Sequence, residues 1–93
     1  MIPTPANAGA SERPRLRELF RLQWEPVQDA YVLLYPEGMV KLNPSAGEIL
    51  SRCDGTHELD DIIDELETLF NSSGLATDVY QFIDHARQRG WVD

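Results

Sequence analysis

Three kinds of side chain in this sequence have the chemistry for catalysis or metal binding: one thiol, two imidazoles and a cluster of carboxylates. Cys53 would be a nucleophile if a nearby base lowered its pKa. His57 and His85 would bind a metal if further ligands lay at suitable spacing. The clustered acids are Glu58, Asp60, Asp61, Asp64, Glu65 and Glu67. Such a cluster is suited to paired catalytic carboxylates or to a calcium ion.

The pattern around these residues argues against each of these sites. Cys53 lies seven residues after Ala46 in a helical apolar series, so we expect it to be buried as a small hydrophobic residue. Neither histidine has a cysteine or histidine at ligand spacing, and we expect both to face solvent near helix ends. The acids surround the polar arc of one predicted helix and lack EF-hand spacing, which is typical of a solvated face. The sequence therefore predicts no catalytic residue, no metal and no cofactor.

Length and composition limit the architecture. A chain of 93 residues with 42% hydrophobic content forms one domain, and a deep catalytic cleft is not expected at this size. We predict a flexible tail at residues 1–13, which are rich in Pro, Ala, Asn and Gly, and a domain at residues 14–93. A single cysteine cannot form an internal disulfide. The start of the sequence lacks a signal-peptide pattern, and no later apolar run would span a bilayer, so we expect a cytoplasmic protein with no membrane partner.

The negative charge is confined to the second half of the sequence. Residues 1–43 hold five acids and five bases, whereas the net charge of −8 lies entirely in residues 44–93. That half has eleven acids against Arg52, Arg87 and Arg89. Such a surface repels phosphate backbones and favours basic or neutral partners, so we expect no nucleic-acid partner.

The first half of the predicted domain has the pattern of three strands. Polar residues alternate with Leu22 and Trp24, which suits a half-buried strand. Residues 30–35 are apolar on both faces, so this strand is expected to be covered on both sides or to lie centrally. Pro36-Glu37-Gly38 has the chemistry of a three-residue hairpin loop with a bulge. It leads into a short edge strand that ends at Leu42.

The second half begins with a helix directly after the last strand. Asn43-Pro44 is a start signal, because Asn caps helices and Pro is tolerated at their first position. Ser45 and Glu48 would alternatively form a capping box. Gly55 is placed to end this helix in the left-handed conformation. Its apolar face is formed by Ala46, Ile49, Leu50 and Cys53.

Two further helices are predicted. One begins near Thr56 and extends to Phe70, and the other is capped by Thr77 or Asp78 and ends at Gly90. The residues expected to be buried are Leu59, Ile62, Ile63, Leu66, Leu69 and Phe70 in the first, Val79, Phe82, Ile83 and Ala86 in the second, and Trp91 and Val92 after it. Three strands followed by three helices with short loops make an α+β fold, in which an antiparallel sheet packs on a helix-turn-helix-like bundle.

Several short motifs lie in an order and spacing that is typical of one family. They are Trp24, Pro36-Glu37-Gly38, Leu42-Asn43, Ala46, Ile49-Leu50, Cys53-Asp54-Gly55 and Gly90-Trp91-Val92. On these residues the sequence resembles the PqqD family, small proteins of pyrroloquinoline quinone (PQQ) biosynthesis, over roughly Arg15 to Asp93. The resemblance implies a winged helix-turn-helix-like fold with its sheet at the N-terminus.

The resemblance also implies a function. Members of this family are peptide chaperones of the kind called RiPP recognition elements, where RiPP denotes a ribosomally made, modified peptide. It implies that the chain is not an enzyme, that it binds the precursor peptide PqqA by strand addition, and that it presents this peptide to the radical S-adenosylmethionine enzyme PqqE. Radical enzymes of that class hold an iron–sulfur centre with clustered cysteines, and this chain has one cysteine. The chemistry would therefore belong to the partner.

The expected binding site combines an edge strand with one side of the last helix. Unpaired N–H and C=O groups of an edge strand accept an extended peptide, and adjacent pockets read its side chains. The family resemblance implies a groove between the third strand and the third helix. The residues we expect to bind peptide are Met39, Val40, Lys41 and Leu42 on the strand and Tyr80, Ile83 and Arg87 on the helix.

Other interpretations remain open at this point. The same apolar residues would serve as ordinary core margin, and Lys41 would then only protect an exposed edge from aggregation. A winged-helix DNA-binding protein is the main alternative function, and a small hydrolase acting at Cys53 is another. A homodimer would form by hairpin exchange or by pairing of edges. The acidic second helix is a candidate for docking the enzyme partner.

Overall fold

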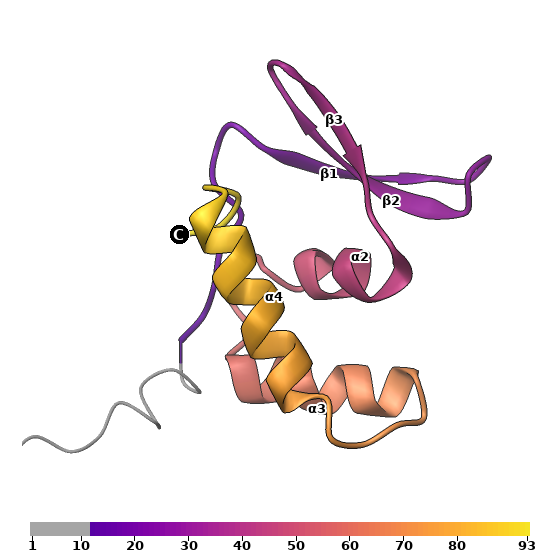
Figure 1. Cartoon of the computed structure of the whole chain (residues 1–93), viewed down its shortest axis with the longest axis vertical. Coiled ribbons are helices and arrows are strands. Elements are labelled where there is room, and N and C mark those ends of the chain that lie inside the picture. Colours follow the sequence, from indigo (N-terminus) through magenta and orange to yellow (C-terminus); the bar gives the residue numbers. More distant parts are fainter. Residues whose placement is uncertain (1–11) are drawn as a thin grey trace, which may run out of the picture.

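The computed structural model describes residues 12–93, so most of the predicted tail lies outside the described residues. Three strands precede three helices, and the predicted α+β class is confirmed (Figure 1). The elements are β1 (Arg21–Glu25), β2 (Ala30–Tyr35), β3 (Gly38–Lys41), α2 (Pro44–Ser51), α3 (Leu59–Leu69) and α4 (Ala76–Gln88). The sheet lies at one end of the molecule, with α2 beneath it, α3 at the other end and α4 running from α3 back toward the sheet (Figure 1).

The sheet is antiparallel with the order β1-β2-β3, so β2 is central as its two apolar faces predict. Leu33 is fully buried on the face toward the helices. Val32, on the other face, is 1% exposed although no helix covers it. It lies opposite Gln23 and Lys41 in the neighbouring strands, and their side chains share this face of the sheet.

The turn between β2 and β3 is shorter than the sequence suggests. Tyr35 pairs directly with Gly38, so the loop has two residues, Pro36 and Glu37, and the predicted three-residue loop with a bulge is wrong. Gly38 is used as the first residue of β3 and pairs in the ladder, which leaves no extra residue to form a bulge.

Helix α2 begins where Asn43-Pro44 predicts. The Asn43 carboxamide oxygen accepts a hydrogen bond from the Ala46 N–H at 2.8 Å, and the alternative capping box is not the cap observed. The helix passes very close to the sheet at Gly47. A Cβ atom there would lie 2.7 Å from the ring of Tyr31, so only glycine permits this approach.

Helix α3 begins three residues later than expected, at Leu59. The carboxylate of Asp54 accepts a hydrogen bond from the Thr56 N–H at 2.9 Å, which holds the preceding residues in a turn instead of a helix. The prediction that Leu69 and Phe70 are buried is also wrong, because they are 51% and 39% exposed. They lie at the end of α3, beyond the part of the helix that packs on the core. The four buried residues of the helix are Leu59, Ile62, Ile63 and Leu66.

Helix α4 begins at Ala76, and the predicted cap at Thr77 or Asp78 is wrong. The N–H of Leu75, at the cap position, instead donates to the carboxylate of Glu67 at 3.0 Å. Gly90 ends the helix with φ of 77°, and the next N–H, of Trp91, bonds the Ala86 carbonyl at 2.8 Å. This turn folds Trp91 and Val92 back onto the core, as predicted.

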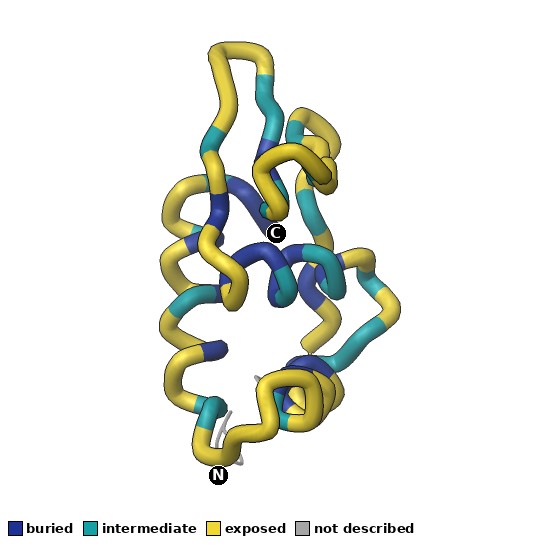
Figure 2. Tube along the Cα trace, turned by 90° about the vertical axis from the view of Figure 1, so that its right-hand side faces the viewer, coloured by how far each residue is buried: buried dark blue, intermediate teal, exposed yellow. Residues whose placement is uncertain are grey.

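Residues 12–17, which we call the N-terminal strap, join the two ends of the domain. The Leu16 N–H donates to the Cys53 carbonyl, and the Arg17 N–H donates to the Trp91 carbonyl, both at 2.9 Å. Pro14 of the strap is fully buried. Buried residues gather where the strap, the helices and the inner face of the sheet meet (Figure 2). Within residues 12–93, no helix has the length and apolar character to cross a membrane.

Candidate functional site

The outer edge of β3 has no strand beside it among residues 12–93. The N–H of Leu42, directly after β3, donates to the Tyr31 carbonyl of β2 at 3.0 Å. Because backbone groups of an antiparallel strand point alternately toward and away from its neighbour, Val40 also faces β2. The N–H and C=O groups of Met39 and Lys41 therefore point outward. This edge offers two donors and two acceptors to an additional strand.

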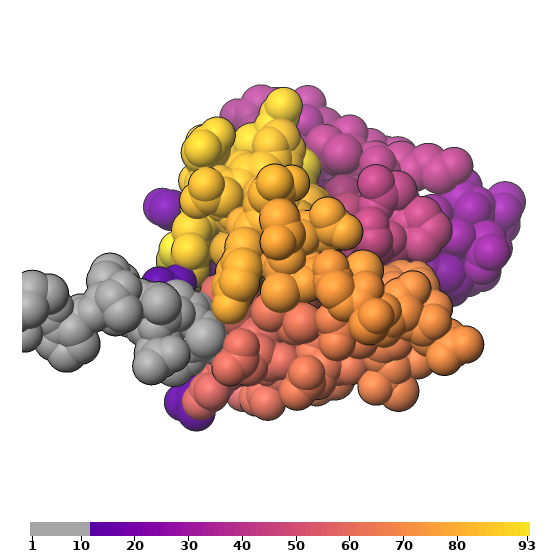
Figure 3. All heavy atoms as spheres, turned by 60° about the horizontal axis from the view of Figure 1, so that its bottom comes forward, coloured from indigo at the N-terminus to yellow at the C-terminus, as the bar shows by residue number. Residues whose placement is uncertain are grey.

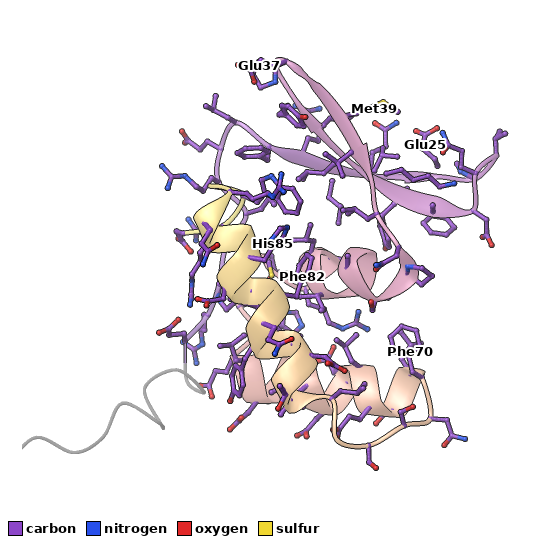
Figure 4. The ribbon with its side chains drawn as sticks, viewed as in Figure 1. Glu25, Glu37, Met39, Phe70, Phe82 and His85 are labelled. Atoms are coloured by element: carbon purple, nitrogen blue, oxygen red, sulfur yellow. The ribbon has the colours of Figure 1, made fainter. Side chains whose placement is uncertain are left out.

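The side chains of β3 divide between the two faces of the sheet. Met39 is 55% exposed and lies on the face away from α2 (Figure 4). Lys41, two residues later in the strand, is exposed and shares this face by alternation. Val40 is half-buried against the core and Leu42 is buried. A peptide added beside β3 would follow the same alternation, with every second side chain directed to the helical side.

A cavity of about 730 Å³ lies on the helical side, between the start of α2, the end of α3 and one side of α4. Its lining residues are Asn43, Pro44, Ser45, Ala46, Ile49, Leu66, Phe70, Ser72, Leu75, Asp78, Val79, Phe82 and His85. Most of these are apolar or uncharged, and Asp78 is the one carboxylate among them. In the space-filling view, α4 and the α3–α4 connection adjoin the region of α2 on this face (Figure 3).

The helix side chains at the cavity are not the ones that we predicted. Phe82 and His85 line it, and both project from α4 toward α2 and the sheet (Figure 4). Tyr80 is 40% exposed and is not a lining residue, and Ile83 is 1% exposed in the core. Arg87 donates one hydrogen bond to the Asp93 carbonyl at 2.9 Å and pairs with the carboxylate of Glu12. The structure therefore does not bring Tyr80 and Arg87 to the cavity beside α2.

The reason lies in the symmetry of an amphipathic helix. The buried stripe of α4 has two sides, and the periodicity of the sequence does not say which of them faces β3. Tyr80 and Arg87 lie on one side of Val79, whereas Asp78, Phe82 and His85 lie on the other. Phe70, which the sequence pattern placed in the core, is partly exposed and lines the cavity.

An aromatic cluster continues from the cavity to the C-terminal end of α4. The rings of Phe82 and His85 lie 6.4 Å apart, and that of His85 meets Trp91 edge-on at 5.7 Å. The guanidinium carbon of Arg89 lies 5.9 Å from the centre of the Trp91 ring. This end of the groove therefore combines aromatic surface with a cation.

Cys53 is buried, as predicted, and its thiol donates to the Ile49 carbonyl at 3.3 Å. Burial raises the pKa of this thiol to about 12, and the neighbouring charge of Asp54 adds to the effect. A thiol with so high a pKa is protonated at neutral pH and is a poor nucleophile.

The other candidate groups take part in surface ion pairs and turns. The hydroxyl and the N–H of Thr56 donate to Asp54 and lower the pKa of its carboxyl to about 2. Asp54 also lies 3.2 Å from His57, which is partly exposed, whereas His85 is exposed. In the described part of the chain, His, Cys, Asp and Glu side chains do not gather in any group of three or more that would hold a metal ion.

The acidic residues of α3 are mostly exposed, as a solvated face predicts. Glu65 of α3, Glu48 of α2 and Glu58 at the N-cap of α3 are held in ion pairs with arginines. Arg52 lies 2.9 Å from Glu48 and 2.8 Å from Glu65, and Arg13 lies 3.1 Å from Glu58. Asp60, Asp61 and Asp64 face solvent.

Comparisons with known proteins agree on one family. The family model described as "Coenzyme PQQ synthesis protein D (PqqD)" matches residues 30–92. A protein of Methylococcus capsulatus named PqqA binding protein is 47% identical over 77 residues, which cover 83% of each chain. One of the same name from Azotobacter vinelandii is 49% identical over 81 residues, which cover 86% of this chain and 88% of the relative.

A solved structure has the same fold. The solution NMR structure of the PqqD truncation of Methylobacterium extorquens PqqCD is described as a functional, stand-alone RiPP recognition element. It matches with a TM-score of 0.71 over 86% of this chain and 87% of that chain. At 24% sequence identity, this likeness shows a shared fold.

Proposed function

Since the chain belongs to the PqqD family, we propose that it is a non-catalytic peptide chaperone of PQQ biosynthesis. In this role it binds the precursor peptide PqqA as a fourth strand beside β3 and presents it to the radical S-adenosylmethionine enzyme PqqE. Residues 14–93 act as the peptide-binding domain. The relatives that are named PqqA binding protein support the choice of peptide.

The observation that carries this proposal is the outward-facing edge of β3, together with an apolar cavity on the helical side whose lining begins at Asn43, two residues after the strand. Met39 and Lys41 present backbone donors and acceptors, which bind an extended peptide whatever its sequence. Side chains of that peptide on the same face as Val40 would be directed toward the helices. Phe70 and Phe82, which line the cavity, offer aromatic surface to them.

The side chains expected from the sequence divide into two groups within this site. The backbone of Met39 and Lys41 forms the hydrogen-bonding edge, and Val40 and Leu42 form its apolar inner side. On α4, Phe82 is the first candidate for contact because it lines the cavity. Tyr80 and Arg87 remain candidates only if the peptide also crosses the opposite side of α4. Ile83 would then act from the core by supporting its neighbours.

The chemistry of the described residues supports a binding role. Cys53 is the nucleophile that a hydrolase would use, and burial keeps its thiol protonated at neutral pH. The modification of the peptide is then assigned to PqqE, whose docking surface must leave β3 accessible. Our candidate for the surface that docks PqqE is the exposed acidic face of α3, formed by Asp60, Asp61 and Asp64. Affinity for PqqE that does not fall with added salt would contradict this docking surface.

The oligomeric state of the protein would affect whether the edge of β3 is free to bind peptide. A homodimer formed by pairing of β3 with β3 of a second copy would occupy the groups that bind the peptide. Dimer formation and peptide binding would then compete. Sedimentation of the protein with and without PqqA measures this, since the peptide would shift such a dimer to a one-to-one complex.

The experiment that tests the function is a titration of ¹⁵N-labelled protein with PqqA, followed residue by residue by NMR. The expected result is saturable shifts that gather on β3 and on the cavity side of α4, including Phe82 and His85. A parallel gel-shift assay with duplex DNA at low salt is expected to show no complex, because the net charge is −8. The absence of any saturable shift with PqqA, or a stable complex with DNA, would contradict the proposed function.

A further inference from the structure

The C-terminal end of α4 has an arrangement of charge that differs from the rest of the C-terminal half. His85 lines the cavity, and Arg89, four residues later at the C-cap of α4, lies on the same side by helical spacing. Both contact the ring of Trp91, at 5.7 Å for His85 and 5.9 Å for Arg89. Asp78, the carboxylate of the cavity, lies seven residues before His85, which is about 10 Å along the helix axis. The groove therefore has an acidic end and a basic end.

Arg89, the cation at the basic end, is available to a ligand. The ion pairs found within residues 12–93 use Arg13, Arg52, His57 and Arg87 as their cations. Arg89 is in none of them and is exposed. A guanidinium that stacks on an aromatic ring keeps its in-plane N–H donors free, and these fit the two oxygens of a carboxylate. The cation–π contact with Trp91 favours one position of the guanidinium before the ligand arrives, which lowers the entropy lost on binding.

We propose that His85, Arg89 and Trp91 form a carboxylate-binding end of the groove, which takes a Glu or Asp side chain of the peptide added to β3. This inference rests on the proposed function, because the peptide backbone is held by the β3 edge. Arg89 donates N–H groups to the carboxylate, and the ring N–H of His85 supplies a further donor. The carboxylate belongs to the set of alternate side chains that share the face of Val40.

Such a contact would fix the register of the bound peptide. Backbone hydrogen bonds to β3 are the same for every register that differs by two residues, so they do not select one. The chain as a whole has a net charge of −8 and repels acidic segments. A carboxylate is therefore stabilised only where local cations outweigh that repulsion. One acidic side chain at this end would place all other residues of the peptide relative to the cavity.

The test uses the full-length protein with PqqA and with PqqA variants in which each Asp or Glu is replaced singly by Asn or Gln. The protein variants are Arg89→Gln and, as the matched control, Arg21→Gln, which removes the same charge from β1 at the other edge of the sheet. Both arginines are exposed, so neither substitution should affect folding, which far-UV circular dichroism checks. Affinity is measured by titration calorimetry.

We expect Arg89→Gln to weaken binding of PqqA at least about fivefold, whereas Arg21→Gln changes it by less than about twofold. One amide variant of the peptide should bind the unchanged protein more weakly by a similar factor. Its affinity should not fall further when the protein carries Arg89→Gln. In ¹⁵N spectra, the indole N–H signal of Trp91 should shift on binding of PqqA but not of that variant.

Two outcomes would overturn the inference, and they are distinguishable. If PqqA shifts the signals of β3 but Arg89→Gln binds as tightly as the unchanged protein, the carboxylate-binding end is refuted while the proposed function stands. If Arg89→Gln weakens the binding of every amide variant of the peptide by the same factor, the arginine attracts the peptide through its general charge. The specific carboxylate site is then also refuted. If PqqA shifts no signal at all, the proposed function fails together with this inference.

Discussion

At the scale of single residues, the contact between Gly47 and Tyr31 sets the distance between α2 and the sheet. A Cβ atom at Gly47 would lie 2.7 Å from the ring of Tyr31, which is also held edge-on by Trp24 with ring centres 5.0 Å apart. The ring therefore has little freedom to move away. This contact is one reason why α2, whose start forms part of the cavity, lies close under β2.

We predict that Gly47→Ala lowers the free energy of unfolding. Overpacking costs about 1–3 kcal/mol, which exceeds the roughly 1 kcal/mol that alanine gains over glycine inside a helix. Urea denaturation measures the change. The control is Gln81→Ala, at an exposed position inside α4, which should change stability by about 0.5 kcal/mol or less. A Gly47→Ala protein that is more stable than the unchanged protein would show that the contact is not tight.

The thiol of Cys53 gives a second prediction at this scale. Because burial raises the pKa of this thiol from its ordinary value of 9.0 to about 12, the folded protein contains about a thousandfold less thiolate at pH 8 than the unfolded chain does. Alkylation by iodoacetamide should therefore be very slow in the native state and fast in urea. The native rate should still increase with pH above 9. Rapid native alkylation at pH 7 would contradict the burial and would reopen a catalytic role for this cysteine.

At the scale of elements, the backbone groups of β3 have two roles. Those that point to β2 stabilise the sheet, and those that point outward are free to bind a peptide. Proline at Lys41 removes an N–H that points away from β2, so the β2–β3 ladder keeps its hydrogen bonds. We predict that Lys41→Pro weakens PqqA binding by about tenfold or more, while Lys41→Ala, which keeps the N–H, has a smaller effect. Calorimetric titration measures both, and thermal unfolding checks the fold. Equal losses for the two variants would mean that the side chain of Lys41, and not the backbone, binds the peptide.

Helix α4 allows the two sides of its buried stripe to be compared. We predict that Phe82→Ala weakens PqqA binding by roughly fivefold to tenfold, because Phe82 lines the cavity. Tyr80→Ala, on the other side of the helix, should leave the affinity within about twofold. A larger loss for Tyr80→Ala than for Phe82→Ala would restore the side of α4 that the sequence pattern suggested.

The elements also show how far sequence reasoning reaches. Local signals predicted the start of α2 correctly, because Asn43 caps the helix through a contact three residues away. The end of α4 was predicted from Gly90, because glycine readily adopts the left-handed conformation that is observed there. The start of α4 was missed because its cap residue, Leu75, has no capping side chain, and the N–H of Leu75 bonds to Glu67, eight residues earlier on another helix. The orientation of α4 toward the cavity was missed for the same reason, since it depends on packing between segments and not on periodicity.

At the scale of the whole molecule, the N-terminal strap closes the domain. It bonds to the residues after α2 and to the C-terminal Trp91, and these contacts join segments more than thirty residues apart in sequence. No local pattern predicts such pairings. Glu12, placed in the predicted tail, accepts the Leu59 N–H through its carbonyl at 3.0 Å and pairs with Arg87 through its carboxylate. The strap thus occupies one side of α4 and leaves the other side to the cavity.

The most direct test of strand addition is amide hydrogen exchange of the free protein and of its complex with PqqA. The amides of Met39 and Lys41 point away from β2, so they should exchange quickly in the free protein and become strongly protected in the complex. The amide of Val40, which faces β2, should be protected in both. The amides of Leu22 and Trp24 point away from β2 at the opposite edge and should stay fast. Protection that appears at Met39 and Lys41 alone is the result predicted here, and unchanged exchange at both in a saturated complex would contradict it.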